Sequence, residues 1–131
     1  MLVPRSIPAV IAPGLHPADD GFLFRVREII RERLGEEGFN VADLASTLGL
    51  DRTTLFRRLQ GLTGDGPLAL IRRSRLEHAA HLLAQPDRVT VGDAAHAVGF
   101  KSVAHFCKSF RDAYGLSPGA WAGAAGEAFV D

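Results

Sequence analysis

The chain has 131 residues, of which 47% are apolar, enough to bury the core of one ordinary domain or two very small ones. Fifteen Lys and Arg balance fifteen Asp and Glu, so the net charge alone argues against a nucleic-acid partner. A single cysteine, Cys107, excludes an internal disulfide and a multi-cysteine zinc site. Without a secretion signal or a long apolar run, we expect a cytoplasmic protein with no membrane segment.

The first part of the chain divides into a linker and a helix. Residues 1–18 are rich in proline and have no clear period, which predicts a flexible linker. After Asp20, apolar residues recur at offsets of three and four, the pattern of an amphipathic helix that Gly35 ends. These residues are Leu23, Val26, Ile30 and Leu34.

Two stretches that lie fifty residues apart repeat each other. VADLASTLGL at 41–50 and VGDAAHAVGF at 91–100 share Val, Asp, Ala and Gly at equal positions, which indicates that one supersecondary unit is used twice. Asn40 and Thr90 precede the two copies as N-caps. Each copy predicts a short helix that ends in a turn at Gly49 or Gly99, where positive φ is often required.

A second helix follows each turn, at about residues 52–60 and 102–113, with Asp51 and Ser102 as N-caps. Helix, glycine turn, helix is the helix-turn-helix pattern, whose second helix can enter the major groove of DNA. Arg57 and Lys108 fall at the same place in the two copies. Both second helices therefore carry a cation at this place, and residues 51–111 as a whole are basic.

No stretch shows the alternation of a β-strand, so we predict an all-α fold of about seven helices. Residues 19–66 and 85–121 form two helix-turn-helix subdomains, and a long helix at 67–84 connects them. This connecting helix spans roughly 25 Å at 1.5 Å per residue. We expect residues 122–131 to be a disordered tail.

Residues 49–83, GLDRTTLFRRLQGLTGDGPLALIRRSRLEHAAHLL, and residues 91–121, VGDAAHAVGFKSVAHFCKSFRDAYGLSPGAW, closely resemble the AraC/XylS type of bacterial DNA-binding domain. The resemblance covers about residues 22–121. It implies two helix-turn-helix units whose second helices enter successive major-groove segments on one face of DNA. The opening FLFRVREIIRERLGEEGFNVADLA further resembles versions of this domain that end response regulators or hybrid sensor kinases.

The first of these helices offers four candidate DNA contacts. Burial of Leu55 and Leu59 leaves the residues around them outside: Arg52, Thr53, Phe56 and Arg57. Arg57 is the best base-reading candidate, because a guanidinium can bridge guanine O6 and N7; a phosphate contact or a solvated arginine is the alternative. Phe56 could meet a thymine methyl or cover the edge of the core, and Arg58 could pair with an acid.

The other helix buries Phe106 and Phe110 and offers six candidates: Lys101, Ser102, Val103, Ala104, His105 and Lys108. Lys101 and Ser102 would meet phosphate at the start of the helix. Val103 and Ala104 could touch thymine methyls or be ordinary exposed residues, and His105 could donate to phosphate or pack. Val103 and Ala104 stand where the family often has polar base-reading side chains, which weakens the expected readout by this unit.

The connecting helix carries the basic run RRSR, with Arg72, Arg73 and Arg75. These arginines could face DNA, but a long helix needs a solvated face, and we favour a structural role for them. His78 and His81 lie one turn apart, and no third ligand completes a metal site with them.

We therefore expect a sequence-specific DNA-binding domain of a transcription regulator. No paired carboxylates, activated nucleophile, phosphate loop or metal set suggests an enzyme, and no cofactor is expected. The alternative, favoured by the neutral charge, is a helical protein-interaction module derived from a DNA-binding domain. Expected partners are double-stranded DNA, RNA polymerase, and an upstream sensor or receiver domain on a longer chain, while the isolated domain should be a monomer.

Overall fold

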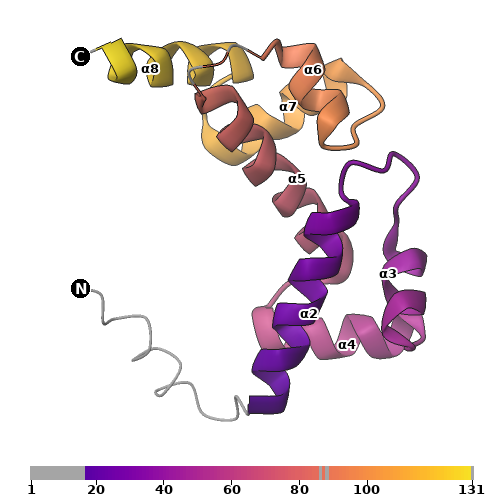
Figure 1. Ribbon diagram of the computed structural model, residues 1–131. Helices are drawn as coiled ribbons and strands as arrows, with labels where there is room; N and C mark the ends of the chain where they lie inside the picture. The colour runs from indigo at the N-terminus through magenta and orange to yellow at the C-terminus, as the bar shows by residue number, and fades with distance from the viewer. Residues whose placement is uncertain (1–16, 86, 88, 131) are drawn as a thin grey trace.

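The computed structural model describes residues 17–130 except 86 and 88, and this part of the chain has helices and no strand. The all-α prediction is therefore confirmed, and the seven helices succeed one another as predicted. Their bounds are α2 (Pro17–Arg33), α3 (Val41–Leu48), α4 (Arg52–Thr63), α5 (Pro67–Ala84), α6 (Val91–Ala97), α7 (Val103–Tyr114) and α8 (Pro118–Val130). Figure 1 shows α5 running from the group α2, α3 and α4 to the group α6, α7 and α8.

The buried residues form two hydrophobic cores, one for each helix-turn-helix unit. The core of the first subdomain collects buried side chains of α2, α3, α4 and the start of α5, among them Val26, Leu44, Leu55, Leu59 and Leu70. The core of the second collects side chains of α5, α6 and α7, and the end of α2 also reaches it: Leu34, Leu76, Val98, Phe106 and Phe110. Both pairs of residues predicted to point inward from the second helices are fully buried.

Helix α5 belongs to both cores and turns a different face to each. Its first half gives Leu70 and Ile71 to the first core, and its second half gives Leu76, Ala79 and Leu83 to the second. At 100° per residue these two sets lie on opposite sides of the helix. The connecting helix therefore joins the subdomains through a continuous, rigid backbone.

Side-chain caps start the helices where the sequence predicts them. The capping box of Asn40 and Asp43 is complete, because each side chain accepts the backbone N–H of the other residue. Thr90 caps α6 by accepting the N–H of Asp93. Gly49 and Gly99 have φ of 73° and 90°, and both turns thus use the left-handed conformation that glycine tolerates best.

Two expectations about the ends of the chain differ from the structure. Residues 122–130 continue α8, so the prediction of a disordered tail is wrong for them. The helix holds because Trp121 anchors it, with its indole N–H donating to the Ala80 carbonyl at 3.0 Å, and because alanine favours helix. At the other end, α2 begins at Pro17, and residues 1–16 of the predicted linker lie outside the described residues.

Among the described residues, none of the helices is both long and apolar enough to span a bilayer.

Candidate nucleic-acid interface

Helix α4 presents a row of exposed polar and aromatic side chains on the side away from the core. Arg52, Thr53 and Arg57 are all exposed, and Thr53 and Arg57 share a face because they lie one turn apart. Phe56 is 52% exposed, yet its ring lies against Gly66, where an added Cβ would meet the ring at 2.8 Å. Phe56 thus covers the turn between α4 and α5 and still offers an apolar face to solvent.

The neighbouring Arg58 contacts α2. Its guanidinium lies over the ring of Phe22, 3.9 Å from the centroid, and 3.6 Å from a carboxylate oxygen of Asp19. Both contacts hold α4 against α2. The expectation that Arg58 pairs with an acid is confirmed, and Arg57 and Arg58 have different environments although they are adjacent.

The start of α4 carries a negative charge. Asp51 accepts the backbone N–H of Thr54 at 2.7 Å and its hydroxyl at 3.0 Å, and these bonds lower the pKa of the Asp51 carboxyl. A carboxylate with a lowered pKa stabilises the fold above its ordinary pKa, and this contribution is lost as the pH falls through the lowered value. Asp51 is therefore ionised at neutral pH, at the end of the helix where phosphates would approach.

Helix α7 presents the matching row in the second subdomain. Lys101, Ser102, Val103, Ala104 and His105 are all exposed around its first turn. The Ser102 oxygen caps the helix by accepting the N–H of His105 at 3.2 Å. Because a hydroxyl both accepts and donates, Ser102 can still donate a hydrogen bond to a phosphate.

Two of the predicted contacts on α7 already have neighbours. The ring of His105 lies 5.6 Å from that of Phe100 and remains exposed, so it packs loosely. Lys108 pairs with Asp112 at 3.1 Å, with both side chains more than half exposed. Exposed pairs of this kind stabilise by about 0–1 kcal/mol, so Lys108 can exchange Asp112 for a phosphate or a base.

The N-terminal part of α5 lies between the two exposed rows. One surface hollow is lined by Arg52, Thr53 and Phe56 of α4 together with Leu68 and Arg72 of α5. A second hollow is lined by the same Leu68 and Arg72 together with residues at the start of α7: Lys101, Ser102 and His105. Six of the ten candidate contacts therefore open on one continuous face, whereas Arg57, Val103, Ala104 and Lys108 line neither hollow.

The three arginines of the connecting helix have three different environments. Arg73 pairs with Asp65 at 2.5 Å, and Arg75 donates to backbone carbonyls. Arg72 is exposed, and within the described part of the chain no hydrogen bond or ion pair holds it. A structural role fits Arg73 and Arg75, whereas Arg72 is an interface candidate that the sequence alone does not single out, because the whole run is basic.

The sequence matches a family model described as a helix-turn-helix domain over residues 44–124. The transcriptional activator NphR of Rhodococcus sp is 32% identical over 85% of this chain, which spans 32% of that relative. Histidine kinase P4 of Formosa agariphila is 31% identical over 76% of this chain, which spans only 7% of that relative. The chain thus covers a third or less of these curated proteins.

Solved structures match the fold over most of the chain. The DNA-binding domain of the transcriptional factor AdpA, solved in complex with a target DNA, is 33% identical with a TM-score of 0.70, covering 78% of this chain and 90% of that one. An AraC-type regulator of Chromobacterium violaceum has the same fold, with 23% identity, a TM-score of 0.74, and coverage of 84% and 96%. The chain belongs to the AraC family of helix-turn-helix DNA-binding domains.

Proposed function

We propose that this domain recognises DNA by placing α4 and α7 in two successive major-groove segments. The observation that carries the proposal is the continuous face on which the starts of both helices open, with Leu68 and Arg72 of α5 between them. The match to the AdpA domain, which was solved with its target DNA, supports it. Successive segments on one face lie about ten base pairs apart, so one monomer reads an asymmetric site.

The residues take different roles in this interface. Arg57 reads a base on α4, with Arg52 and Thr53 beside it on the phosphates and Phe56 near a thymine methyl. At the start of α7, Lys101, Ser102 and His105 contact phosphate. Val103 and Ala104 meet thymine methyls, and Lys108 reads a base at the position that corresponds to Arg57. Arg72 contacts the backbone between the two segments, since an exposed guanidinium there would otherwise face only solvent.

Selection of binders from a random double-stranded pool tests this proposal. We expect a consensus of two blocks about one helical turn apart, bound at least ~10³-fold more tightly than a scrambled duplex at physiological salt. Binding that is equal for both duplexes and merely fades with salt would leave only non-specific attraction to phosphate.

We expect Arg57→Ala to lose sequence preference in the first block alone, by about 1–3 kcal/mol for the base that it contacts. Arg58→Ala is the matched control, because the Arg58 guanidinium is already engaged by Asp19 and Phe22 of α2. Lys108→Ala should affect only the second block. Titrations of duplexes mutated in one block at a time measure both effects, and equal losses for Arg57→Ala and Arg58→Ala would contradict the assignment.

We expect Asp51→Asn to tighten binding to any duplex at low salt and to lower the stability only by the part that the ionised Asp51 carboxylate contributes. Asparagine caps helices as well as aspartate does, while the substitution removes a negative charge from the approach of phosphate. The gain should fade as salt rises, because exposed charges are screened. Thermal unfolding and titration of a random duplex at two salt concentrations measure the two quantities; an unchanged affinity at low salt would speak against phosphate near Asp51.

The alternative function, a protein-interaction module, predicts that Arg57→Ala leaves partner binding intact and that affinity hardly depends on salt. For the whole protein we propose an upstream sensor or receiver domain and RNA polymerase as further partners, action in the cytoplasm, and a monomeric isolated domain. The domain's role is binding rather than catalysis. The names of NphR, a transcriptional activator, and AdpA, a global transcriptional factor, support a binding role.

A further inference from the structure

Arg75 lies near the middle of α5, where the two subdomains meet. Its Nη1 donates to the carbonyl of Gly99 at 3.4 Å, in the turn between α6 and α7. Its Nη2 donates to the carbonyls of Phe39 at 3.2 Å and Glu36 at 3.5 Å, in the loop between α2 and α3. One guanidinium therefore joins the helix-turn-helix of the second subdomain to the loop that precedes that of the first.

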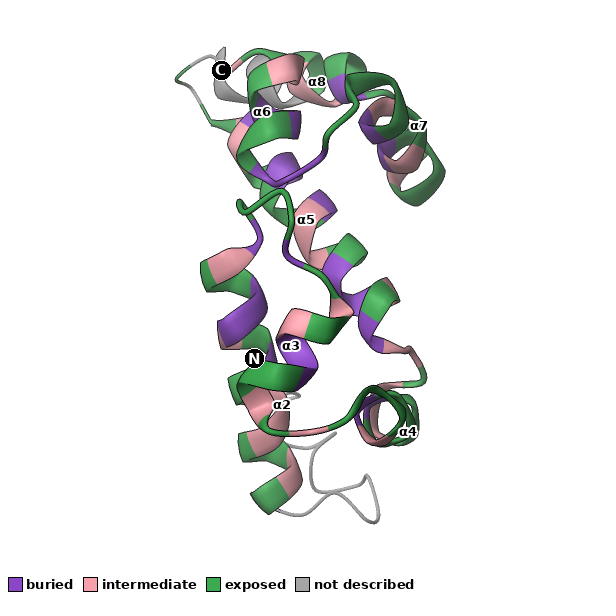
Figure 2. Cartoon of the chain, turned by 90° about the vertical axis from the view of Figure 1, so that its right-hand side faces the viewer, coloured by how far each residue is buried: buried purple, intermediate pink, exposed green. Residues whose placement is uncertain are grey.

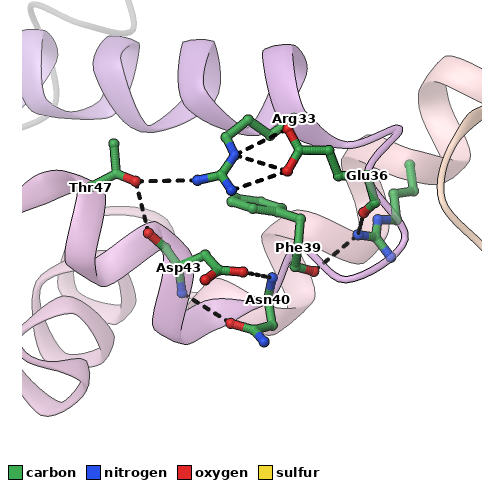
Figure 3. Close-up of polar contacts among 7 residues, drawn as sticks. Arg33, Glu36, Phe39, Asn40, Asp43 and Thr47 are labelled. Atoms are coloured by element: carbon green, nitrogen blue, oxygen red, sulfur yellow. Dashed lines mark hydrogen bonds and ion pairs between the residues drawn. The ribbon is translucent and has the colours of Figure 1, made fainter.

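The loop between α2 and α3 is itself held firmly within the first subdomain. Arg33 pairs with Glu36 at 3.0 Å and lies over the ring of buried Phe39, 4.8 Å from its centroid. The capping box of Asn40 and Asp43 then fixes the start of α3, as Figure 3 shows. The loop carbonyls that Arg75 binds are therefore held in a fixed position relative to the first helix-turn-helix.

A direct backbone contact lies beside Arg75. A Cβ built on Gly99 would stand 2.3 Å from the carbonyl oxygen of Leu34 and 3.2 Å from Cζ of Arg75, and one on Gly35 would stand 3.0 Å from the carbonyl oxygen of Ala97. The end of α2 thus touches the turn before α7 without an intervening side chain. Figures 1 and 2 both place the loop after α2 next to this turn.

The chemistry of Arg75 suits a rigid joint. The side chain is partly buried, and burial lowers its pKa, while its Nε is buried without a hydrogen-bond partner among the described residues. All the bonds that this part of the chain offers it are to backbone carbonyls. A planar guanidinium can donate in two directions from fixed positions, which a single ammonium group does less well.

We propose that Arg75, with the contact of Gly99 on Leu34, fixes the separation and angle of α4 and α7 and so sets the number of base pairs between the two DNA blocks. We name this set of contacts the clamp. The inference rests on the proposed function and adds a positioning residue that does not itself touch DNA. In the basic run on the connecting helix, Arg72 would thus contact a DNA phosphate, and Arg75 would fix the positions of the two reading helices.

The consequence for DNA follows from helix geometry. One inserted base pair moves the second block by about 3.4 Å along the axis and rotates it by about 35°. Rigidly joined reading helices cannot follow that movement, whereas loosely joined ones can. A coupling of the usual size between two sites corresponds to a factor of about 5–150 in affinity, and this factor is the penalty that we expect for wrong spacing.

The test compares duplexes with one base pair inserted or deleted between the two selected blocks. The unchanged 131-residue chain should lose roughly 5- to 150-fold in affinity on either change. Arg75→Gln should bind the duplex with the selected spacing more weakly than the unchanged chain does. Its affinity should fall much less when a base pair is inserted or deleted. Arg73→Gln, which breaks only the pair with Asp65, should keep the original spacing penalty.

Thermal unfolding followed by circular dichroism shows which variants are folded during the titrations. If Arg75→Gln is unfolded, Arg75→Lys takes its place, because lysine keeps the aliphatic stem and the charge but not the planar guanidinium that donates in two directions. Arg75→Lys should also reduce the loss of affinity on a change of spacing. The clamp is overturned if a folded Arg75 variant loses as much affinity on a change of spacing as the unchanged chain does. It is also overturned if Arg73→Gln reduces that loss as much as the Arg75 variant does. A chain that prefers no duplex over its scramble overturns the proposed function instead, before any variant is made.

Discussion

We expect Gly99→Ala to lower the free energy of unfolding by about 2–5 kcal/mol, the sum of a backbone cost of about 1–2 kcal/mol and an overpacking cost of about 1–3 kcal/mol. The backbone cost arises because φ at Gly99 is 90°, a conformation that side chains resist. The overpacking cost arises because the new Cβ would stand 2.3 Å from the carbonyl oxygen of Leu34. That oxygen cannot move alone, because the side chain of Leu34 is buried in the second core.

Gly49→Ala is the matched control for this prediction. Gly49 occupies the same place in the first helix-turn-helix and has a similar φ of 73°, yet nothing lies within 4 Å of a Cβ built there. Its substitution should cost only the backbone part, about 1–2 kcal/mol. Urea unfolding of both variants measures the difference, and equal losses would show that the contact between Gly99 and Leu34 contributes nothing.

The same pair of glycines marks a limit of sequence reasoning. The repeat predicts both turns correctly, because positive φ is a local property of the chain. It also makes the two glycines look equivalent, whereas only Gly99 faces another subdomain. Symmetry in a sequence therefore predicts the repeated unit and not its surroundings.

Local signals account for most of the fold that the sequence predicted. The caps at Asn40, Asp51, Thr90 and Ser102 act within three residues along the chain, so their side chains suffice to place the helix starts. Burial of Leu55, Leu59, Phe106 and Phe110 follows from helical period. The exposed candidates for DNA contact follow from the same period, by elimination.

Long-range contacts account for what the sequence did not predict. Arg75 bonds to carbonyls 24, 36 and 39 residues away, and backbone acceptors carry no signature in the residue type. The change of buried face along α5 is likewise invisible in a list of its apolar residues, because it depends on which core each half meets. The start of α8 likewise depends on a distant contact, because the Ala80 carbonyl that anchors Trp121 lies 41 residues away along the chain.

Phe110→Ala should cost about 3–5 kcal/mol of unfolding free energy, the usual loss for a buried phenylalanine. Phe110 is fully buried at the centre of an aromatic cluster, with ring centroids of Phe106, Tyr114 and Trp121 at 5.6, 4.7 and 5.7 Å. Truncation removes contacts to all three rings and leaves a cavity beneath α7. Phe24→Ala, at a side chain 66% exposed, is the control and should change stability by no more than about 0.5 kcal/mol.

The way in which Phe110→Ala unfolds also tests how the two cores are connected. Helix α5 contributes buried residues to both, and Arg75 and Gly99 join their outer parts. We therefore expect one cooperative transition at a lower denaturant concentration, with near-ultraviolet and far-ultraviolet circular dichroism changing together. Two separate transitions would mean that the second subdomain unfolds alone. The clamp would then be too weak to hold α4 and α7 in one register on DNA.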